Sequence, residues 1–128
     1  MRILLMVLAV VVAILAVGML VVVAKDRDLR DLVINEVDLS RIPDGVYVGS
    51  FRNWRMMNEV EVTVEDHRII AIENTNNMPD DRSRTIVEQA TEAVLAGQSV
   101  QIDTISGASL NTKAFQKAVE NALTDGLK

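Results

Sequence analysis

The sequence contains no cysteine and only one histidine among its 128 residues. Without thiols the chain cannot hold an iron–sulfur cluster or a thiolate zinc site, form a disulfide, or carry the lipid of a lipoprotein. The single histidine, His67, cannot make a metal site alone, so we expect a turn residue there and no resident metal. Basic patches are also absent, and the formal net charge is −5. An acidic chain of this kind is a poor candidate for binding nucleic acid or an anionic lipid surface.

Charge is missing from one long segment, residues 3–24, which is apolar apart from Gly18. A helix of that length would be about 33 Å long, enough to cross a hydrocarbon layer of about 30 Å. Since only a helix satisfies its own backbone in a bilayer, residues 1–24 predict a transmembrane anchor. A cleaved signal sequence and a buried core helix stay open as alternatives, although the run exceeds the usual signal core of roughly 7–15 residues.

Residues 25–42 follow the apolar segment and predict a helical stalk or linker. Apolar residues recur there at helical spacing among charges: Leu29, Leu32, Val33 and Val37. Pro-Asp-Gly at residues 43–45 should end the helix, because proline lacks the amide and Asp-Gly favours a turn. Residues 43–128 would then form one small domain.

At the start of that domain, apolar and polar residues alternate with a period of two, which is typical of a β-strand. Residues 45–51 alternate, and in residues 59–65 three valines alternate strictly with polar residues. Residues 68–74 form a third strand pattern, separated from the second by Asp66 and His67 only. Two strands joined by two residues predict a hairpin with one face toward solvent.

Two helices follow the strands. The first, at about 82–96, should be capped by Asp80 or Asp81 and stopped by Gly97. Residues 98–103 read as a short extended piece before a last helix at about 110–124. The fold class is therefore α+β: a small, mainly antiparallel sheet of three or four strands with helices on one face, preceded by a transmembrane helix. The expected buried stripes are Ile86, Val87, Ala90, Ala93 and Val94 in the first helix, and Phe115, Ala118, Val119, Ala122 and Leu123 in the last.

Four small residues, Ser106, Gly107, Ala108 and Ser109, stand immediately before the last helix. They leave the backbone uncrowded, so several amides could point into one concavity at the positive end of the helix. Such a helix start suits a phosphate-sized anion with serine hydroxyls at its lip. The alternative is a plain cap, in which Ser109 satisfies one helix amide and the other residues are loop.

The ending DTISGASLNTKAFQKAVENAL resembles the C-terminal signature of FMN-binding domains. Those domains occur in the flavin subunits of the sodium-pumping quinone reductase and of the related electron-transport complex. Their signature reads Asp-x-x-Ser-Gly-Ala-Thr-x-Thr-Ser, then Lys-Ala and an alanine-rich helix. The upstream strand patterns are also similar to this family, and the resemblance spans roughly residues 43–123.

In that family the motif threonine is joined through a phosphoester to FMN by a dedicated flavin transferase. The resemblance therefore implies Ser109 as the acceptor of covalent FMN, with serine in place of the usual threonine. Both residues supply a hydroxyl, so the chemistry is retained. The cofactor-binding residues that the resemblance implies beside it are Asp103, Ser106, Gly107, Ala108, Leu110 and Thr112.

Two further features have alternatives that the sequence leaves open. Asp103 could orient the motif or hold the metal used during attachment, or it could cap the turn. Tyr47 and Trp54 could stack on the flavin ring, or they could close the edge of a small core. We expect Tyr47 to contact the cofactor.

The function implied is a membrane-anchored electron-transfer flavoprotein. The sequence offers no base, nucleophile or metal cluster elsewhere, so we name no catalytic residue and expect an electron carrier or a subunit of an oxidoreductase complex. The alternatives are a flavin-free structural or assembly subunit and a small FMN-dependent reductase. Expected partners are a flavin transferase, membrane redox proteins and, through residues 3–24, membrane lipid, but no nucleic acid.

Two lines of reasoning disagree on which side of the membrane the soluble domain lies. Lys25, Arg27 and Arg30 follow the apolar segment and weakly place the domain in the cytoplasm. Covalent attachment is most useful outside the cytoplasm, where free FMN is scarce and a reversible site would stay empty. We expect a single-pass protein of the cytoplasmic membrane with an extracytoplasmic domain, because the charge count depends on a very short leading flank.

Overall fold

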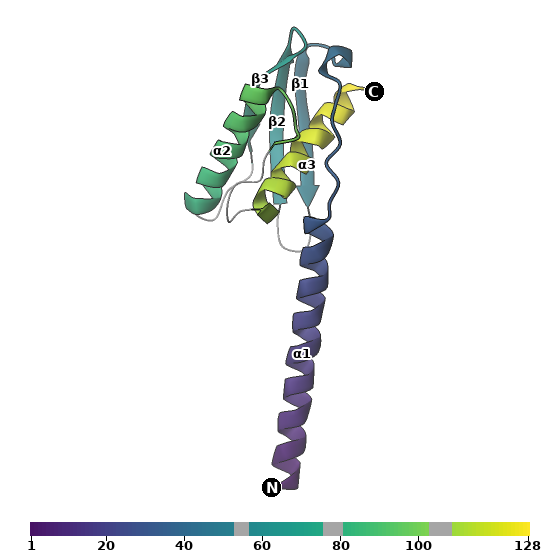
Figure 1. Cartoon of the computed structure of the whole chain (residues 1–128), viewed down its shortest axis with the longest axis vertical. Helices are drawn as coiled ribbons and strands as arrows, with labels where there is room; N and C mark the ends of the chain where they lie inside the picture. The colour runs from purple at the N-terminus through teal and green to yellow at the C-terminus, as the bar shows by residue number, and fades with distance from the viewer. Residues whose placement is uncertain (53–56, 76–80, 103–108) are drawn as a thin grey trace. The chain divides into compact units, whose positions relative to one another are not determined.

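A computed structural model describes residues 1–52, 57–75, 81–102 and 109–128 (Figure 1). The chain divides into two compact units, Met1–Asp31 and Leu32–Lys128. The first unit consists of helix α1, Arg2–Arg30, of which Arg2–Lys25 is long and apolar enough to cross a membrane. By length and composition this stretch could therefore anchor the chain in a membrane, as predicted.

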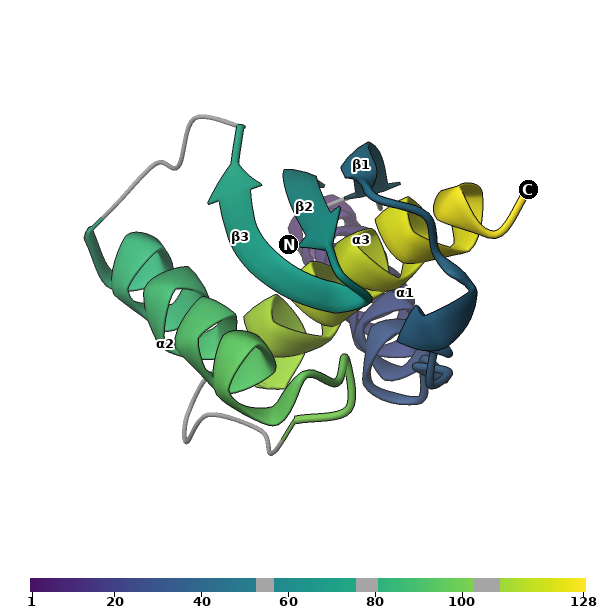
Figure 2. The same cartoon turned by 90° about the horizontal axis from the view of Figure 1, so that it is seen from above.

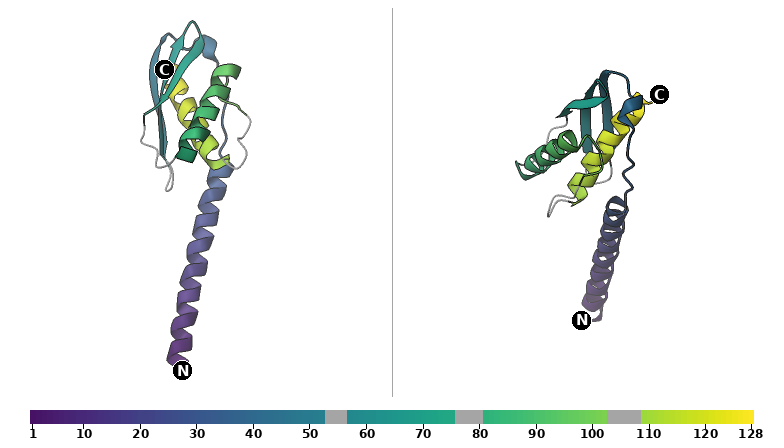
Figure 3. Two further views of the ribbon diagram at one scale, coloured as in Figure 1. Left: turned by 90° about the vertical axis from the view of Figure 1, so that its left-hand side faces the viewer. Right: turned by 45° about the horizontal axis from the view of Figure 1, so that its top comes forward.

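The second unit is a three-stranded antiparallel sheet with two helices on one face. The strands lie in the order β1-β2-β3, and α2 and α3 cover the same side of the sheet (Figures 2 and 3). This confirms the predicted α+β class. In chain order the elements are the short 3₁₀ helix η1 (Leu39–Arg41), β1 (Gly45–Arg52), β2 (Met57–Glu65), β3 (Arg68–Asn74), α2 (Asp81–Gly97) and α3 (Ser109–Gly126).

The β2–β3 hairpin forms as the alternation predicts. Val60, Val62 and Val64 are buried against the helices. Asp66 and His67 connect the strands with φ of 57° and 59°, a turn whose two positive φ angles match the twist of a hairpin. His67 is exposed in that turn, as expected of a turn residue.

Gln98 occupies the place where a fourth strand would pair with β3. Its side-chain Oε1 accepts from the Ile69 amide at 2.7 Å, and its Nε2 donates to the Ile69 carbonyl at 2.9 Å. One amide side chain thus satisfies both backbone groups of an edge residue, and the segment after α2 forms no strand among its described residues. Gln98, with a left-handed φ of 51°, is the residue that follows the end of α2. Gly97, which was expected to stop the helix, is its last residue.

Helix α3 contributes more residues to the core than any other described element. Its predicted stripe is confirmed: Phe115, Ala118, Val119, Ala122 and Leu123 are all at most 1% exposed. The stripe of α2 is confirmed except for Ala93, which is only half-buried. Small residues let α3 approach the sheet closely, so that the backbone of α3 lies directly against Gly49 of β1.

The helical stalk predicted for residues 25–42 is only partly found. Helix α1 continues to Arg30, but residues 32–38 have no regular secondary structure. We call residues 32–37 the strap. Ile34 and Val37 of the strap belong to the domain core, whereas Val33 is 67% exposed, so the predicted helical stripe is wrong here. The strap packs into the domain because its hydrogen-bond partners, Gln101, Lys113 and Lys117, belong to the domain although they lie far away in the sequence.

Candidate functional site

Helix α3 begins at Ser109, the residue that the resemblance implies as the flavin acceptor. The first amides of a helix have no partner within the helix, so this end of α3 suits a negatively charged group. Four of the predicted cofactor-binding residues lie outside the described residues: Asp103, Ser106, Gly107 and Ala108. Leu110 follows Ser109 in the first turn of α3. Their contacts to a cofactor stay predictions.

Thr112, in the same turn, is fully buried. Its side chain therefore lies in the interior of the domain rather than on an open lip around the helix start. A contribution of Thr112 to the cofactor site stays a prediction.

Tyr47 is not near the motif. Its hydroxyl donates to the Pro43 carbonyl at 2.5 Å, and its ring packs beside Gly126, where an added Cβ would come within 3.0 Å of the ring. Gly126 ends α3, roughly 25 Å along the helix from Ser109. Contact of Tyr47 with the flavin stays a prediction, and in the structure the residue closes the core at the end of α3 far from Ser109. Trp54 lies outside the described residues.

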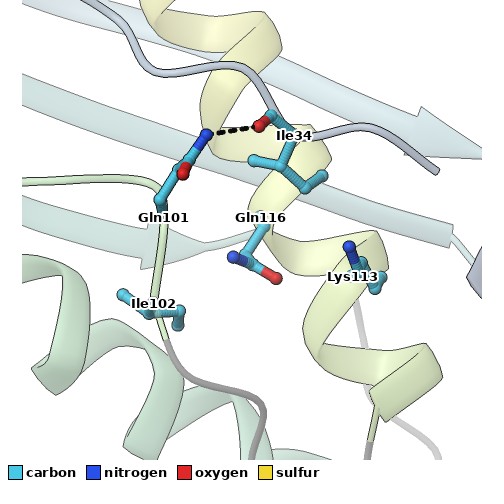
Figure 4. Close-up of a pocket in the computed structure, with 5 residues that line it drawn as sticks. All are labelled: Ile34, Gln101, Ile102, Lys113 and Gln116. Carbon is cyan, nitrogen blue, oxygen red and sulfur yellow. Dashed lines mark hydrogen bonds between the residues drawn. The ribbon is translucent and has the colours of Figure 1, made fainter. Parts of the chain in front are cut away.

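A cavity of about 160 Å³ lies one to two turns beyond Ser109 (Figure 4). The strap, the segment after α2 and the first half of α3 each contribute to its wall. Its lining residues are Ile34, Gln101, Ile102, Lys113 and Gln116.

Side chains hold the strap at the wall of this cavity. In the part of the chain that the structure describes, no strand pairs with the strap, so its carbonyls need other donors. Three consecutive carbonyls find these donors on α3 and on Gln101. These hydrogen bonds are Lys113 Nζ to Leu32 O (3.1 Å), Lys117 Nζ to Val33 O (3.3 Å) and Gln101 Nε2 to Ile34 O (2.7 Å).

The polar side chains that line the cavity are Gln101, Lys113 and Gln116. Gln116 is only 4% exposed, and its Nε2 donates to the Val100 carbonyl at 2.8 Å. Its Oε1 points away from that bond, on the side of Lys113 (Figure 4). The cavity thus combines an ammonium group and amide groups with the apolar side chains of Ile34 and Ile102.

A family model described as the FMN-binding domain matches residues 54–124, more than half of the chain. This chain belongs to the FMN-binding domain family. No curated protein matches the sequence. The family match begins within the connection between β1 and β2 and ends in the last turns of α3, so it includes the whole hairpin, α2, and the motif at the start of α3.

The described residues fit the phosphate end of an FMN group. FMN is an anion with a polar ribityl chain, and the helix start and the Lys113 ammonium offer positive charge within one turn of each other. The cavity alone is too small for a complete flavin, since pockets for ligands of that size measure about 300 Å³ or more. The start of α3 is therefore the described part of the chain that suits a phosphate group.

Sequence reasoning missed Lys113, Gln116 and Gln101 as site residues. Lys113 was within the quoted motif, and its spacing of four residues from Ser109 was a signal that the two share a helix face. No comparable signal marks Gln101 or the strap, because their contacts join residues 67 to 84 positions apart.

Proposed function

We propose that the chain is a membrane-anchored electron carrier whose FMN is joined through a phosphodiester to the Ser109 hydroxyl. The observation that carries the proposal is the position of Ser109 as the first residue of α3 in a domain of the FMN-binding family. The helix start would stabilise the charge of the diester by about 0.3–1 kcal/mol.

Formation of the diester needs an activated donor. A flavin dinucleotide holds the FMN phosphate in an anhydride, so the serine oxygen would form the new bond to phosphorus while adenosine monophosphate leaves. The serine proton is released to solvent or to a base of the transferase. A flavin transferase is thus a partner that acts once on each chain.

Once bound, FMN accepts and donates one or two electrons, and the protein positions it and sets its potential. Redox partners would be membrane proteins, because the apolar Arg2–Lys25 stretch would hold the domain close to the membrane. A domain outside the cytoplasm fits the covalent bond best, since a reversible site would empty where free FMN is scarce.

One rival is a flavin-free structural subunit with the same fold. It is considered because a serine, Ser109, replaces the threonine of the family motif. Flavin fluorescence of the denatured full-length chain separates the two. We expect a fluorescent band after denaturing electrophoresis when the chain is produced in cells that contain a flavin transferase. Matched cells without the transferase should give an equal amount of chain and no fluorescence. A dark band in both strains would favour the structural subunit.

A further inference from the structure

Strand β1 has one edge that no described strand covers, since the strands lie in the order β1-β2-β3. The hydrogen bonds of Ser50 show which of its residues face that edge. The Glu59 carbonyl, opposite Ser50, accepts from the Thr75 amide on the β3 side. The Ser50 carbonyl accepts from the Asn121 side chain of α3 at 2.8 Å. The backbone groups of Ser50 therefore point away from β2.

Val46 and Val48 point the same way, because the direction of the backbone groups alternates along an antiparallel pair. Their side chains are 59% and 52% exposed, on the sheet face opposite the helices. A regular, exposed edge strand with apolar side chains is a template for pairing with another chain. From Gly45 to Phe51, β1 has no charge and no proline, and its described pairing with β2 has no register shift. This edge thus lacks the usual protections.

The other edge of the sheet, on β3, is protected. Gln98 satisfies both backbone groups of Ile69 there. The pairing of β2 with β3 contains a register shift, and β3 carries the charged residues Arg68 and Glu73. Irregular pairing and charged side chains are devices that prevent edge strands from joining other chains. Of the two edges that the structure describes, the β1 edge is therefore the one suited to accept a further strand.

We propose that β1 pairs with β1 of a second copy of this chain, antiparallel and centred on Val48, so that the two sheets become one. Charge complementarity favours this occupant. Asp44 and Arg52 lie four residues from Val48 in opposite directions, so Arg52 of each copy would lie opposite Asp44 of the other. Opposite charges directly across a strand pair are stabilising. The residues between them that face the edge are uncharged, so no like charges meet.

The hydrogen bonds already present at this edge are compatible with the pairing. A carbonyl oxygen has two lone pairs, so Ser50 can accept from an amide of the second copy while it keeps its bond to α3. Asp44 accepts from the Asp66 amide through Oδ1 at 2.9 Å, and a carboxylate has further positions for an arginine. A single strand pair buries a small area, so we expect a dimer that forms and dissociates reversibly.

The test uses introduced cysteines, because the chain contains none of its own. Val48→Cys would place two thiols directly opposite each other, with Cα atoms about 5.5 Å apart, within the range for a disulfide. Mild oxidation of the full-length variant in detergent should give a dimer on non-reducing electrophoresis. Ala71→Cys is the matched control, because Ala71 is exposed on the same sheet face but lies on β3. It should stay monomeric.

A mixture of two further variants tests the register. Val46 of one copy would lie opposite Ser50 of the other, so Val46→Cys and Ser50→Cys chains should form a mixed dimer, identified by its intact mass. Each variant alone should cross-link poorly, since its two thiols would be about 13 Å apart along the strands. Equal cross-linking of all variants, Ala71→Cys included, would indicate random collision and overturn the proposal. No dimer from Val48→Cys would overturn it as well.

Sedimentation of the unmodified chain in detergent is the second measurement. The wild type should form a dimer whose share rises with concentration, and Val48→Lys should be monomeric, because a lysine on an edge strand prevents pairing. The Val48 side chain lies outside the core, so this variant should keep its fold. A dimer that survives Val48→Lys would place the contact elsewhere in the chain and contradict the proposal. So would a wild-type chain that stays monomeric.

Arg52 tests the charge complementarity in the same experiment. Arg52→Glu should raise the dissociation constant of the dimer about threefold or more, because like charges would then face each other at both ends of the pairing. Arg52→Lys should leave the constant nearly unchanged. An equal constant for the Glu and Lys variants would contradict this register. None of these measurements needs flavin, so their outcome is independent of the proposed function.

Discussion

Ser109→Ala is expected to abolish covalent flavin completely. The diester needs an oxygen nucleophile at the start of α3, and alanine supplies none. Intact mass of the denatured chain, produced with a flavin transferase, should show one FMN less one water on the wild type and no added mass on the variant. Ser109→Thr should retain the added mass, because threonine supplies the hydroxyl that the family motif normally carries.

Ser106→Ala is the matched control for this experiment. It removes a second serine of the same motif and leaves the Ser109 hydroxyl intact. The Ser106 variant loses one residue of the predicted cofactor site but should still acquire covalent FMN, because the diester forms at Ser109. Added mass that persists on Ser109→Ala and disappears on Ser106→Ala would move the attachment point and contradict the assignment of Ser109.

Gly49→Val is expected to disrupt the domain. A Cβ at Gly49 would lie 2.2 Å from the Ala118 carbonyl oxygen and 2.3 Å from the Ala122 amide nitrogen. Both are backbone atoms of α3, so no side chain can move aside, and β1 and α3 would have to separate. We expect a loss of about 3 kcal/mol or more in the free energy of unfolding. Hydrogen exchange at the β2 amides of the full-length chain should then be faster by a factor of about 100.

Gly97→Ala gives the comparison for a glycine without this constraint. Among the described residues, and apart from the backbone of α2 itself, no atom lies within 4 Å of a Cβ added at Gly97, and the φ of Gly97 is outside the left-handed region. Alanine there should be neutral or stabilising by about 0.4–1 kcal/mol, because it restricts the unfolded chain. Equal exchange rates in the Gly49 and Gly97 variants would contradict the close packing of β1 on α3.

The hairpin and both helices of the domain could be predicted because their signals are local. Strict alternation at Val60, Val62 and Val64 places all three valines on one face of the strand. The two-residue connection pairs Glu65 with Arg68, although the register shifts between Thr63 and Val64. The stripe of α3 is equally local, since Phe115 and Val119 are one turn apart. Such patterns predict which face is buried without knowledge of what covers it.

The strap could not be predicted for the opposite reason. Its apolar residues have helical spacing, and a local pattern therefore favours a helix. The strap instead has no regular secondary structure, and Lys113 and Lys117 donate to its carbonyls from more than 80 residues away. These hydrogen bonds and the burial of Ile34 outweigh the weak helix preference, and neither can be read from residues 25–42.

Tyr47 shows the limit of reasoning from residue type at the site. An aromatic ring suits a flavin and a small core equally well, and only the fold decides between them. Here the register of β1 brings Tyr47 to the last turn of α3 rather than the first.

The most direct measurement is the mass of one tryptic peptide from flavin-loaded chain. Cleavage after Arg84 and Lys113 releases residues 85–113 as a single peptide, which contains Ser99, Ser106 and Ser109. We predict that this peptide carries FMN through a phosphodiester and that fragment ions place the added mass on Ser109. An unmodified peptide, or fragments that place the flavin on any other residue, would contradict a cofactor held at the start of α3.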